Sequence, residues 1–170
     1  IWLNTQRPEW NDANNALVGN GTSMVTVYYL KRFLKFFKKM MMNLDINHVD
    51  VSFEVLSWFN EVERVVQESK GTSHTSISEN DRMTYVSRLG EVYEDYRNKI
   101  YFKGFSTFEK LSLEKLECFI SIISNQFDET IISNRRKNGL FDAYNTININ
   151  LHNKSMDVKK LDLMLEGQVA

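Results

Sequence analysis

The sequence has 170 residues, a formal net charge of −1, 42% hydrophobic residues and 25% charged residues. This composition suits one folded domain and excludes a wholly disordered chain. One cysteine excludes an internal disulfide framework, and near-neutral charge excludes a globally basic nucleic-acid binder. No apolar run has the ~18 residues of a membrane span. We therefore expect neither nucleic acid nor a membrane as a partner.

The first half of the chain shows two helical patterns. Proline occurs once, which favours long uninterrupted helices. Apolar residues at alternating steps of three and four predict a first helix from about Ser23 to Met42. A second stripe predicts a helix from about Ser52 to Glu68, with Asp50 or Ser52 as its N-cap.

Two further helices are predicted in the second half. The third begins near Asp81, because Ser78 and Asp81 have the spacing of a capping box. The fourth follows Ser112. Stripes of this width are typical of helices packed on helices. The residues that we expect to be buried are Leu30, Leu34, Phe37, Phe59, Leu89, Tyr96, Leu116, Ile120 and Ile123.

The remaining segments complete the predicted organisation. Residues 1–22 form a polar loop, residues 133–154 an irregular or extended connection, and a last helix begins near Ser155. The fold class that these patterns predict is all-α, built of antiparallel helical hairpins. Because the chain starts without methionine and ends on what reads as a helix start, we expect residues 1–170 to be a single segment of a longer protein.

Charge is distributed unevenly between the predicted helices. The first helix carries five basic residues within nine positions, namely Lys31, Arg32, Lys35, Lys38 and Lys39, and the second helix is mainly acidic. If these helices form an antiparallel hairpin, their surfaces complement each other. We interpret the basic stripe as a solvated face and Phe33, Phe36 and Phe37 beside it as core, with binding of anionic lipid or phosphate as the alternative.

Metal and cofactor chemistry lacks its usual patterns. The three histidines are not spaced like ligands, either from one another or from Cys118, which predicts no metal site. Cys118 lies on an apolar helical pattern and is expected to be a buried structural thiol. Glycine is too sparse for a phosphate-binding loop, so we expect no cofactor.

The most unusual segment precedes the first helix. Arg7, Glu9, Trp10, Asn11 and Asp12 lie within six positions, next to the only proline. An indole stacks on the apolar face of a sugar ring, Arg and Asn bond to its hydroxyls, and a carboxyl group protonates a glycosidic oxygen. The alternative is a polar loop folded by Asx-type turns around a partly buried Trp.

The run from Arg7 to Gly19, with Ser23-Met24-Val25-Thr26, resembles a stretch of large, mostly uncharacterised bacterial proteins related to (α/α)6-barrel glycoside hydrolases and phosphorylases. Trp10-Asn11-Asp12 is similar to the Trp-Asn-Asp element of cellobiose-phosphorylase-like enzymes, in which an aspartate acts as general acid. The resemblance covers about residues 5–30 and again residues 165–170. Between these two segments only the presence of predicted helices agrees.

The resemblance implies a part of an α/α toroid within a longer catalytic domain. It makes Asp12 the first candidate for the general acid and Glu9 the second, because Glu9 stands where the family often has Gly or Asp. Trp10, Arg7 and Asn11 would contact the sugar. A partner carboxylate or a phosphate pocket is not recognisable, so this chain alone is expected to lack a complete active site.

The sequence thus predicts a segment of a carbohydrate-active enzyme, either a hydrolase or a phosphorylase-like enzyme, that carries its general-acid loop. The alternative is a non-catalytic helical interaction or scaffold module. The expected partners are an oligosaccharide substrate and the remainder of a longer chain. Four helices leave apolar surface that they cannot cover, which predicts self-association or a large exposed apolar patch.

Overall fold

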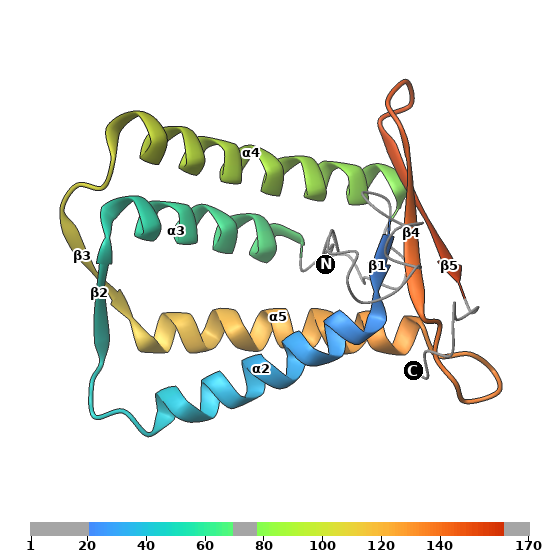
Figure 1. Ribbon diagram of the computed structural model, residues 1–170, viewed down its shortest axis with the longest axis horizontal. Coiled ribbons are helices and arrows are strands. Elements are labelled where there is room, and N and C mark those ends of the chain that lie inside the picture. Colours follow the sequence, from blue (N-terminus) through green and yellow to red (C-terminus); the bar gives the residue numbers. More distant parts are fainter. Residues whose placement is uncertain (1–20, 70–77, 162–170) are drawn as a thin grey trace, which may run out of the picture. The chain divides into compact units, whose positions relative to one another are not determined.

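The computed structural model describes residues 21–69 and 78–161. These residues form four helices and five strands in the order β1, α2, β2, α3, α4, β3, α5, β4, β5 (Figure 1). The expected all-α class, with helical hairpins as part of an α/α toroid, is wrong, because the strands build two antiparallel sheets. The described part of the chain has a mixed α/β fold.

The four predicted helices are confirmed. They are α2 (Met24–Met42), α3 (Phe53–Glu68), α4 (Glu79–Lys103) and α5 (Leu113–Ser133). Serine side chains begin two of them: the Ser52 hydroxyl accepts from the Val55 N–H at 3.3 Å, and Ser78 accepts from Asp81 at 3.1 Å. Such caps satisfy N–H groups that have no partner inside the helix, so the local sequence sets these helix starts.

The first sheet has three strands in the order β1, β4, β5. These are β1 (Gly21–Ser23), β4 (Tyr144–Asn150) and β5 (Ser155–Leu161). β4 and β5 form a hairpin in which Asn150 lies opposite Ser155. The last helix predicted from Ser155 is therefore wrong. The segment alternates instead, with Met156 buried and Asp157 exposed, and it pairs with β4.

The second sheet is a two-stranded ribbon of β2 (His48–Ser52) and β3 (Phe108–Ser112). His48 lies opposite Ser112, and Ser52 lies opposite Phe108. Each strand runs directly into a helix, β2 into α3 and β3 into α5. The ribbon therefore aligns the starts of these two helices, although their sequences are about sixty residues apart.

The chain divides into two compact units. Among the described residues, unit 1 comprises 21–35 and 124–161, and unit 2 comprises 36–69 and 78–123. In unit 1 the buried apolar residues are Met24, Val27, Phe127, Ala143, Tyr144 and Met156. In unit 2 they are Met41, Phe59, Val65, Val66, Leu111, Ile120 and Ile122. Each unit thus has a core of its own.

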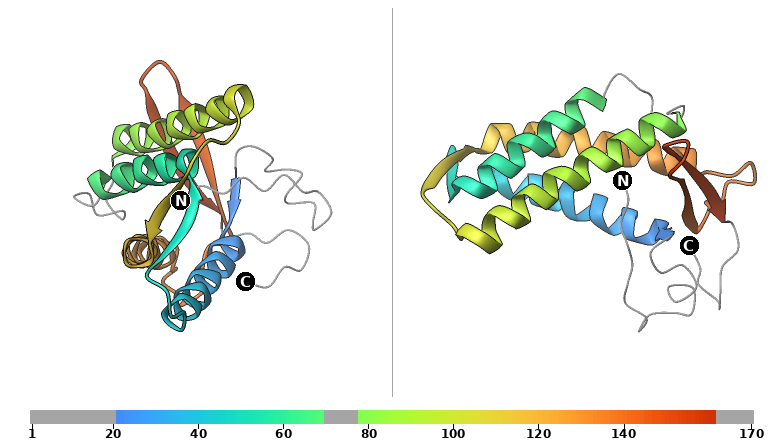
Figure 2. Two further views of the ribbon diagram at one scale, coloured as in Figure 1. Left: turned by 90° about the vertical axis from the view of Figure 1, so that its left-hand side faces the viewer. Right: turned by 90° about the horizontal axis from the view of Figure 1, so that it is seen from above.

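In unit 2, α3 and α4 pack side by side (Figures 1 and 2). The Trp58 and Tyr96 rings lie 5.5 Å apart at this contact. No residue of α4 is buried. Leu89 and Tyr96, which were expected to be buried, both belong to this helix, so neither is fully buried.

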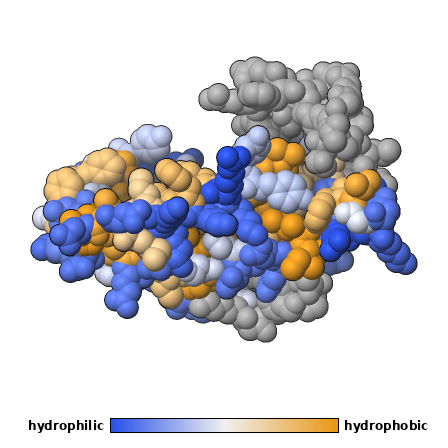
Figure 3. All heavy atoms as spheres, turned by 90° about the horizontal axis from the view of Figure 1, so that it is seen from below, coloured by the Kyte–Doolittle hydropathy of each residue, from blue (hydrophilic) through white to orange (hydrophobic). Residues whose placement is uncertain are grey.

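Of the nine residues expected to be buried, Phe59 and Ile120 are. The others are half-buried: Leu30, Leu34, Phe37, Leu89, Tyr96, Leu116 and Ile123. Many other large apolar side chains reach the surface, and Figure 3 shows hydrophobic patches between hydrophilic residues. The apolar stripes are therefore only partly covered within the described residues.

Candidate functional site

The sequence-predicted site lies outside the described residues. Arg7, Glu9, Trp10, Asn11 and Asp12 all precede Gly21, where the described chain begins as β1. β1 pairs with β4, so that Ser23 lies opposite Tyr144, and the Met24 N–H donates to the Ala143 carbonyl at 2.9 Å. The chain that follows the predicted loop is thus fixed into the sheet of unit 1.

Polar side chains are buried near this attachment point. Asn134 and Asp142 are 1% and 8% exposed, and the Asp142 N–H donates to the Asn134 carbonyl at 2.9 Å. Arg136 lies 3.8 Å from the Asp142 carboxylate and donates to the Phe141 carbonyl at 3.3 Å. These contacts fold the turn between α5 and β4, which is a structural role.

Tyr28 lies one helical turn after Met24. Its ring meets Phe141 edge-on with the ring centres 6.1 Å apart. The hydroxyl is buried and has no hydrogen-bond partner among the described residues. Burial raises the pKa of Tyr28, because the phenolate form loses more hydration than the neutral form. The side chain is therefore a neutral phenol at physiological pH.

The basic residues of α2 divide into two groups. In unit 1 Lys31 pairs with Asp128, and in unit 2 Lys38 pairs with Glu117 at 3.1 Å and donates to Ser121 at 3.0 Å. The acidic partners that the structure shows for Lys31 and Lys38 belong to α5 and not to α3. Arg32, Lys35 and Lys39 are exposed.

The sequence predicts that the aromatic residues beside the basic stripe of α2 belong to the core. Phe33 and Phe36 are instead 54% and 63% exposed, whereas Phe37 is half-buried. The spacing is correct for one side of α2, on which Val27 and Met41 are buried. It could not show that a second apolar side faces solvent.

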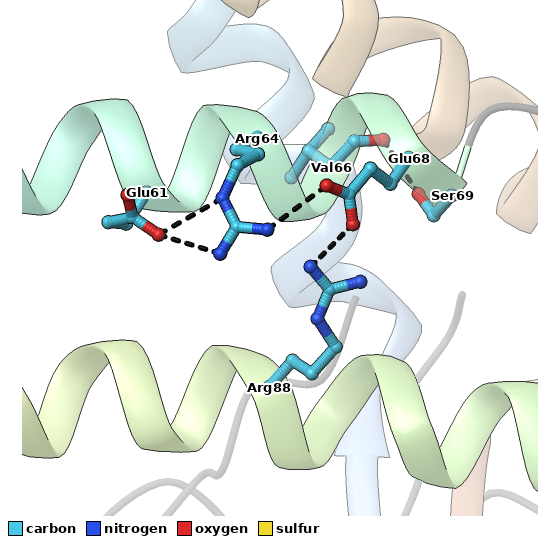
Figure 4. Close-up of polar contacts among 6 residues, drawn as sticks. All are labelled: Glu61, Arg64, Val66, Glu68, Ser69 and Arg88. Carbon is cyan, nitrogen blue, oxygen red and sulfur yellow. Dashed lines mark hydrogen bonds and ion pairs between the residues drawn. The ribbon is translucent and has the colours of Figure 1, made fainter.

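A network of charged residues links α3 and α4 (Figure 4). Arg64 donates to Glu61 at 2.7 and 3.1 Å and to Glu68 at 3.0 Å, and Arg88 of α4 lies 2.5 Å from Glu68. Hydrogen bonds from Arg88 and then Arg64 lower the pKa of Glu68. The pKa of Arg64 is raised, chiefly by its bond to Glu61. The network keeps its charges, and exposed pairs of this kind stabilise weakly.

A second charged cluster joins α3 and α5. The Lys115 ammonium lies 3.0 Å from Glu63 and 2.6 Å from the Asn60 side-chain oxygen, and it stands 5.7 Å from the centre of the Phe59 ring. Glu63 is buried at 9% exposure. The ammonium compensates a carboxylate that would otherwise be buried without a counter-charge.

Glu54 is the second buried carboxylate of unit 2, with 8% exposure. It accepts from the Ser106 hydroxyl at 2.5 Å and from the Ser106 N–H at 3.1 and 3.2 Å. The hydroxyl bond is the main cause of its lowered pKa. A general acid needs a raised pKa, so neither Glu54 nor Glu68 is suited to donate a proton at neutral pH.

The described residues also bear on metal binding, thiol chemistry and membrane insertion. Within 21–69 and 78–161, no three His, Cys, Asp or Glu side chains are grouped as metal ligands would be. Cys118 is exposed, so the predicted buried thiol is wrong. No helix in the described part of the chain has the length and apolar character needed to cross a membrane.

Sequence reasoning missed the surface between α4 and β3. Four aromatic residues, Tyr101, Phe102, Phe105 and Phe108, are exposed there, as is Phe53 at the start of α3. The signal was four aromatic residues in eight positions, directly after a helical stripe and around Gly104. A glycine at a helix end marks a turn, but it does not tell whether the aromatic residues around it are buried or exposed.

The described residues define a mixed α/β protein of two compact units. No protein-family model matches the chain, and no curated protein matches it.

Proposed function

We propose that this chain is a segment of a carbohydrate-active enzyme, a glycoside hydrolase or a phosphorylase-like enzyme, whose general-acid loop lies within residues 1–22. The observation that carries this proposal is the grouping of Arg7, Glu9, Trp10, Asn11 and Asp12. Glycoside cleavage requires a carboxyl group that protonates the leaving oxygen beside groups that orient the sugar.

Asp12 is the proposed proton donor and Glu9 the second candidate. Trp10 stacks on the sugar ring, and Arg7 and Asn11 bond to its hydroxyls. A donor at neutral pH needs a raised pKa, which the indole beside it and the like charge of Glu9 would provide. The partner carboxylate of a hydrolase, or the phosphate pocket of a phosphorylase, is proposed to come from the remainder of a longer chain.

The test is an assay on α- and β-linked disaccharides, with and without phosphate, of the longest protein that contains this sequence. Asp12→Asn keeps the size of the side chain but removes the proton, and we expect turnover to fall by about 10²–10⁴ with little change in sugar binding. Glu9→Gln is the matched comparison. A substrate with an acidic leaving group needs no protonation, so Asp12→Asn should affect its cleavage much less.

The outcomes separate the assignments. If Glu9→Gln abolishes turnover and Asp12→Asn does not, the two carboxyl groups exchange roles. If both variants keep full turnover on both kinds of substrate, the loop has no part in catalysis.

The second candidate is a non-catalytic interaction or scaffold module. It is favoured by the exposed aromatic residues between α4 and β3, because a surface of this kind is typical of protein contacts. Under this proposal no disaccharide is turned over, and Trp10→Phe does not change the affinity of the chain for a partner protein.

A further inference from the structure

One side of α2 exposes hydrophobic and basic side chains to solvent. Every exposed residue of this helix is either hydrophobic or basic. Tyr29, Phe36 and Met40 have exposed fractions of 66%, 63% and 42%. The exposed basic residues are Arg32, Lys35 and Lys39. We name these six residues the α2 face.

The spacing of these residues places them on one side of a single helix. α2 runs without interruption from Met24 to Met42 (Figure 1). Tyr29, Phe36 and Met40 follow one another at steps of seven and four, which aligns them along the helix surface. Val27 and Met41 lie on the opposite side and are buried. The helix therefore has one side in the core and another side in solvent.

The α2 face carries an excess of positive charge. The two half-buried lysines of α2 pair with carboxylates of α5, whereas the three cations of the α2 face have no ion pair within residues 21–69 and 78–161. α2 itself contains no acidic residue. The exposed carboxylates around it are Asp45, which follows the helix, and Glu114, which lies one turn before Glu117 on α5. Three cations outnumber these two carboxylates.

The rest of unit 1 adds further positive charge. Besides those of α2, its exposed basic residues within the described chain are Arg135, Lys137, Lys154, Lys159 and Lys160, against one exposed acidic residue, Asp157. Of its other acidic residues, Asp128 and Asp142 pair with Lys31 and Arg136, and Glu129 is half-buried. An uneven charge of this kind attracts a polyanionic surface from a distance of about one Debye length, roughly 8–10 Å.

The combination of cations and hydrophobic side chains indicates which anionic partner fits. Aromatic rings can stack on the bases of a nucleic acid, but the exposed Met40 gains nothing from stacking. A helix with Lys and Arg beside aromatic and aliphatic residues suits the headgroup region of an anionic bilayer, where it lies in the membrane plane. Such a helix needs no apolar run long enough to span the membrane. The solvated-face interpretation of the basic stripe placed Phe36 in the core, and its exposure removes that reason.

We propose that the α2 face binds the surface of a membrane that contains anionic lipid. Arg32, Lys35 and Lys39 contact the lipid headgroups. The side chains of Tyr29, Phe36 and Met40 enter the boundary between headgroups and acyl chains. This inference goes beyond the proposed function and does not depend on the catalytic loop, so either can fail without the other.

The first test measures sedimentation of the longest protein that contains this sequence with vesicles of phosphatidylcholine, alone or mixed with phosphatidylserine. We expect binding only to the mixed vesicles, weakening as salt is added. Replacing Arg32, Lys35 and Lys39 together by Gln should lower the partition coefficient about a hundredfold, because each cation near an anionic surface contributes about fivefold. The matched control replaces Arg97, Lys99 and Lys103 of α4 by Gln. These three residues are also exposed, and their replacement should change the partition coefficient by less than about threefold.

The second test concerns the hydrophobic side chains. Tyr29→Ser and Phe36→Ser should each lower the partition coefficient about tenfold, because each removes a ring that is buried in the bilayer. Phe102→Ser is the matched control, since Phe102 on α4 is 84% exposed, and it should have no effect. Circular dichroism checks that each variant keeps its fold.

Several results would overturn the proposal. They are the absence of binding to mixed vesicles, equal binding to phosphatidylcholine alone, and equal losses in the α4 controls. Binding that survives both Tyr29→Ser and Phe36→Ser would also overturn it. If the protein instead binds a single-stranded oligonucleotide through Arg32, Lys35 and Lys39 and binds no vesicles, the α2 face is a nucleic-acid surface. If Phe36→Ser abolishes self-association of a protein that binds no vesicles, the α2 face is a protein contact.

Discussion

The carboxylate of Glu54 accepts hydrogen bonds from both the backbone N–H and the hydroxyl of Ser106, which lies 52 residues further along the chain. Glu54 is in the first turn of α3, where unpaired N–H groups and the helix dipole favour a negative charge. The same carboxylate thus stabilises the start of a helix and holds the loop that connects α4 to β3. This pair therefore couples the chemistry of a helix start to the placement of a loop that is distant in the sequence.

The first prediction concerns the pH dependence of this pair. The pKa of Glu54 is lowered in the folded chain, so the carboxylate stabilises the fold above the ordinary pKa of glutamate. This contribution is lost as pH falls from that value through the lower folded-state pKa. We expect Glu54→Gln to lower the free energy of unfolding at neutral pH, and the difference from the wild type to shrink at about pH 3.

Urea unfolding at both pH values measures this difference. Glu109→Gln is the control, because Glu109 is an exposed glutamate of β3. A Glu54→Gln effect of equal size at both pH values would show that packing, rather than ionisation, carries the contribution.

The second prediction compares one substitution at two glycines of the same region. Gly104 ends α4 with a φ of 71°, which side chains rarely adopt, whereas Gly90 lies inside α4 with open space around it. Gly104→Ala should lower the free energy of unfolding by about 1–2 kcal/mol through backbone strain. Gly90→Ala should raise it by about 0.5–1 kcal/mol, because alanine favours the helix. Equal signs in thermal unfolding would contradict the backbone conformation at Gly104.

The third prediction tests the core of unit 1. Phe127 is among the largest fully buried side chains, with 1% exposure. Phe127→Ala should lower the free energy of unfolding by about 3–5 kcal/mol, because the cavity adds to the lost burial. Ile132→Ala, on the same helix at 66% exposure, should change it by less than about 0.5 kcal/mol. Chemical denaturation measures both, and similar losses would mean that Ile132 is covered in solution.

The fourth prediction concerns the buried hydroxyl of Tyr28. Tyr28→Phe removes a polar atom that has no partner among the described residues, so we expect the free energy of unfolding to rise by about 1 kcal/mol. The neighbouring Tyr29→Phe, at 66% exposure, should have almost no effect. Spectrophotometric titration should also show one phenol with a raised pKa that is missing from Tyr28→Phe. A loss of stability in that variant would show that the hydroxyl has a partner in solution.

The helices were predictable because their signals are local. Ser52 and Ser78 each cap the helix that follows through a bond to an N–H three residues on, and Gly104 marks the end of α4. The strands were not predictable in this way. The sequence predicts a helix where β5 lies, because the seven residues from Ser155 to Leu161 are compatible with either state and only pairing with β4 decides between them.

The candidate sites show the same division. The grouping of Glu9, Trp10 and Asp12 is a sequence observation, since these residues are neighbours along the chain. The cluster of Glu63 with Lys115 and the bond of Glu54 to Ser106 join residues 52 positions apart. No spacing rule connects residues so far apart. The sequence therefore does not distinguish the buried Glu54 and Glu63 from exposed glutamates of the same helix.

The sequence by itself determined the four helices and the serine caps of α3 and α4, because these depend on residues within one or two turns. Only the tertiary structure decided that β2 pairs with β3, that α5 supplies the acidic partners of Lys31 and Lys38, and that Phe102 and Phe108 remain exposed. Strand pairing, charge compensation and burial depend on which distant segment packs against each residue. A local sequence pattern does not contain that information.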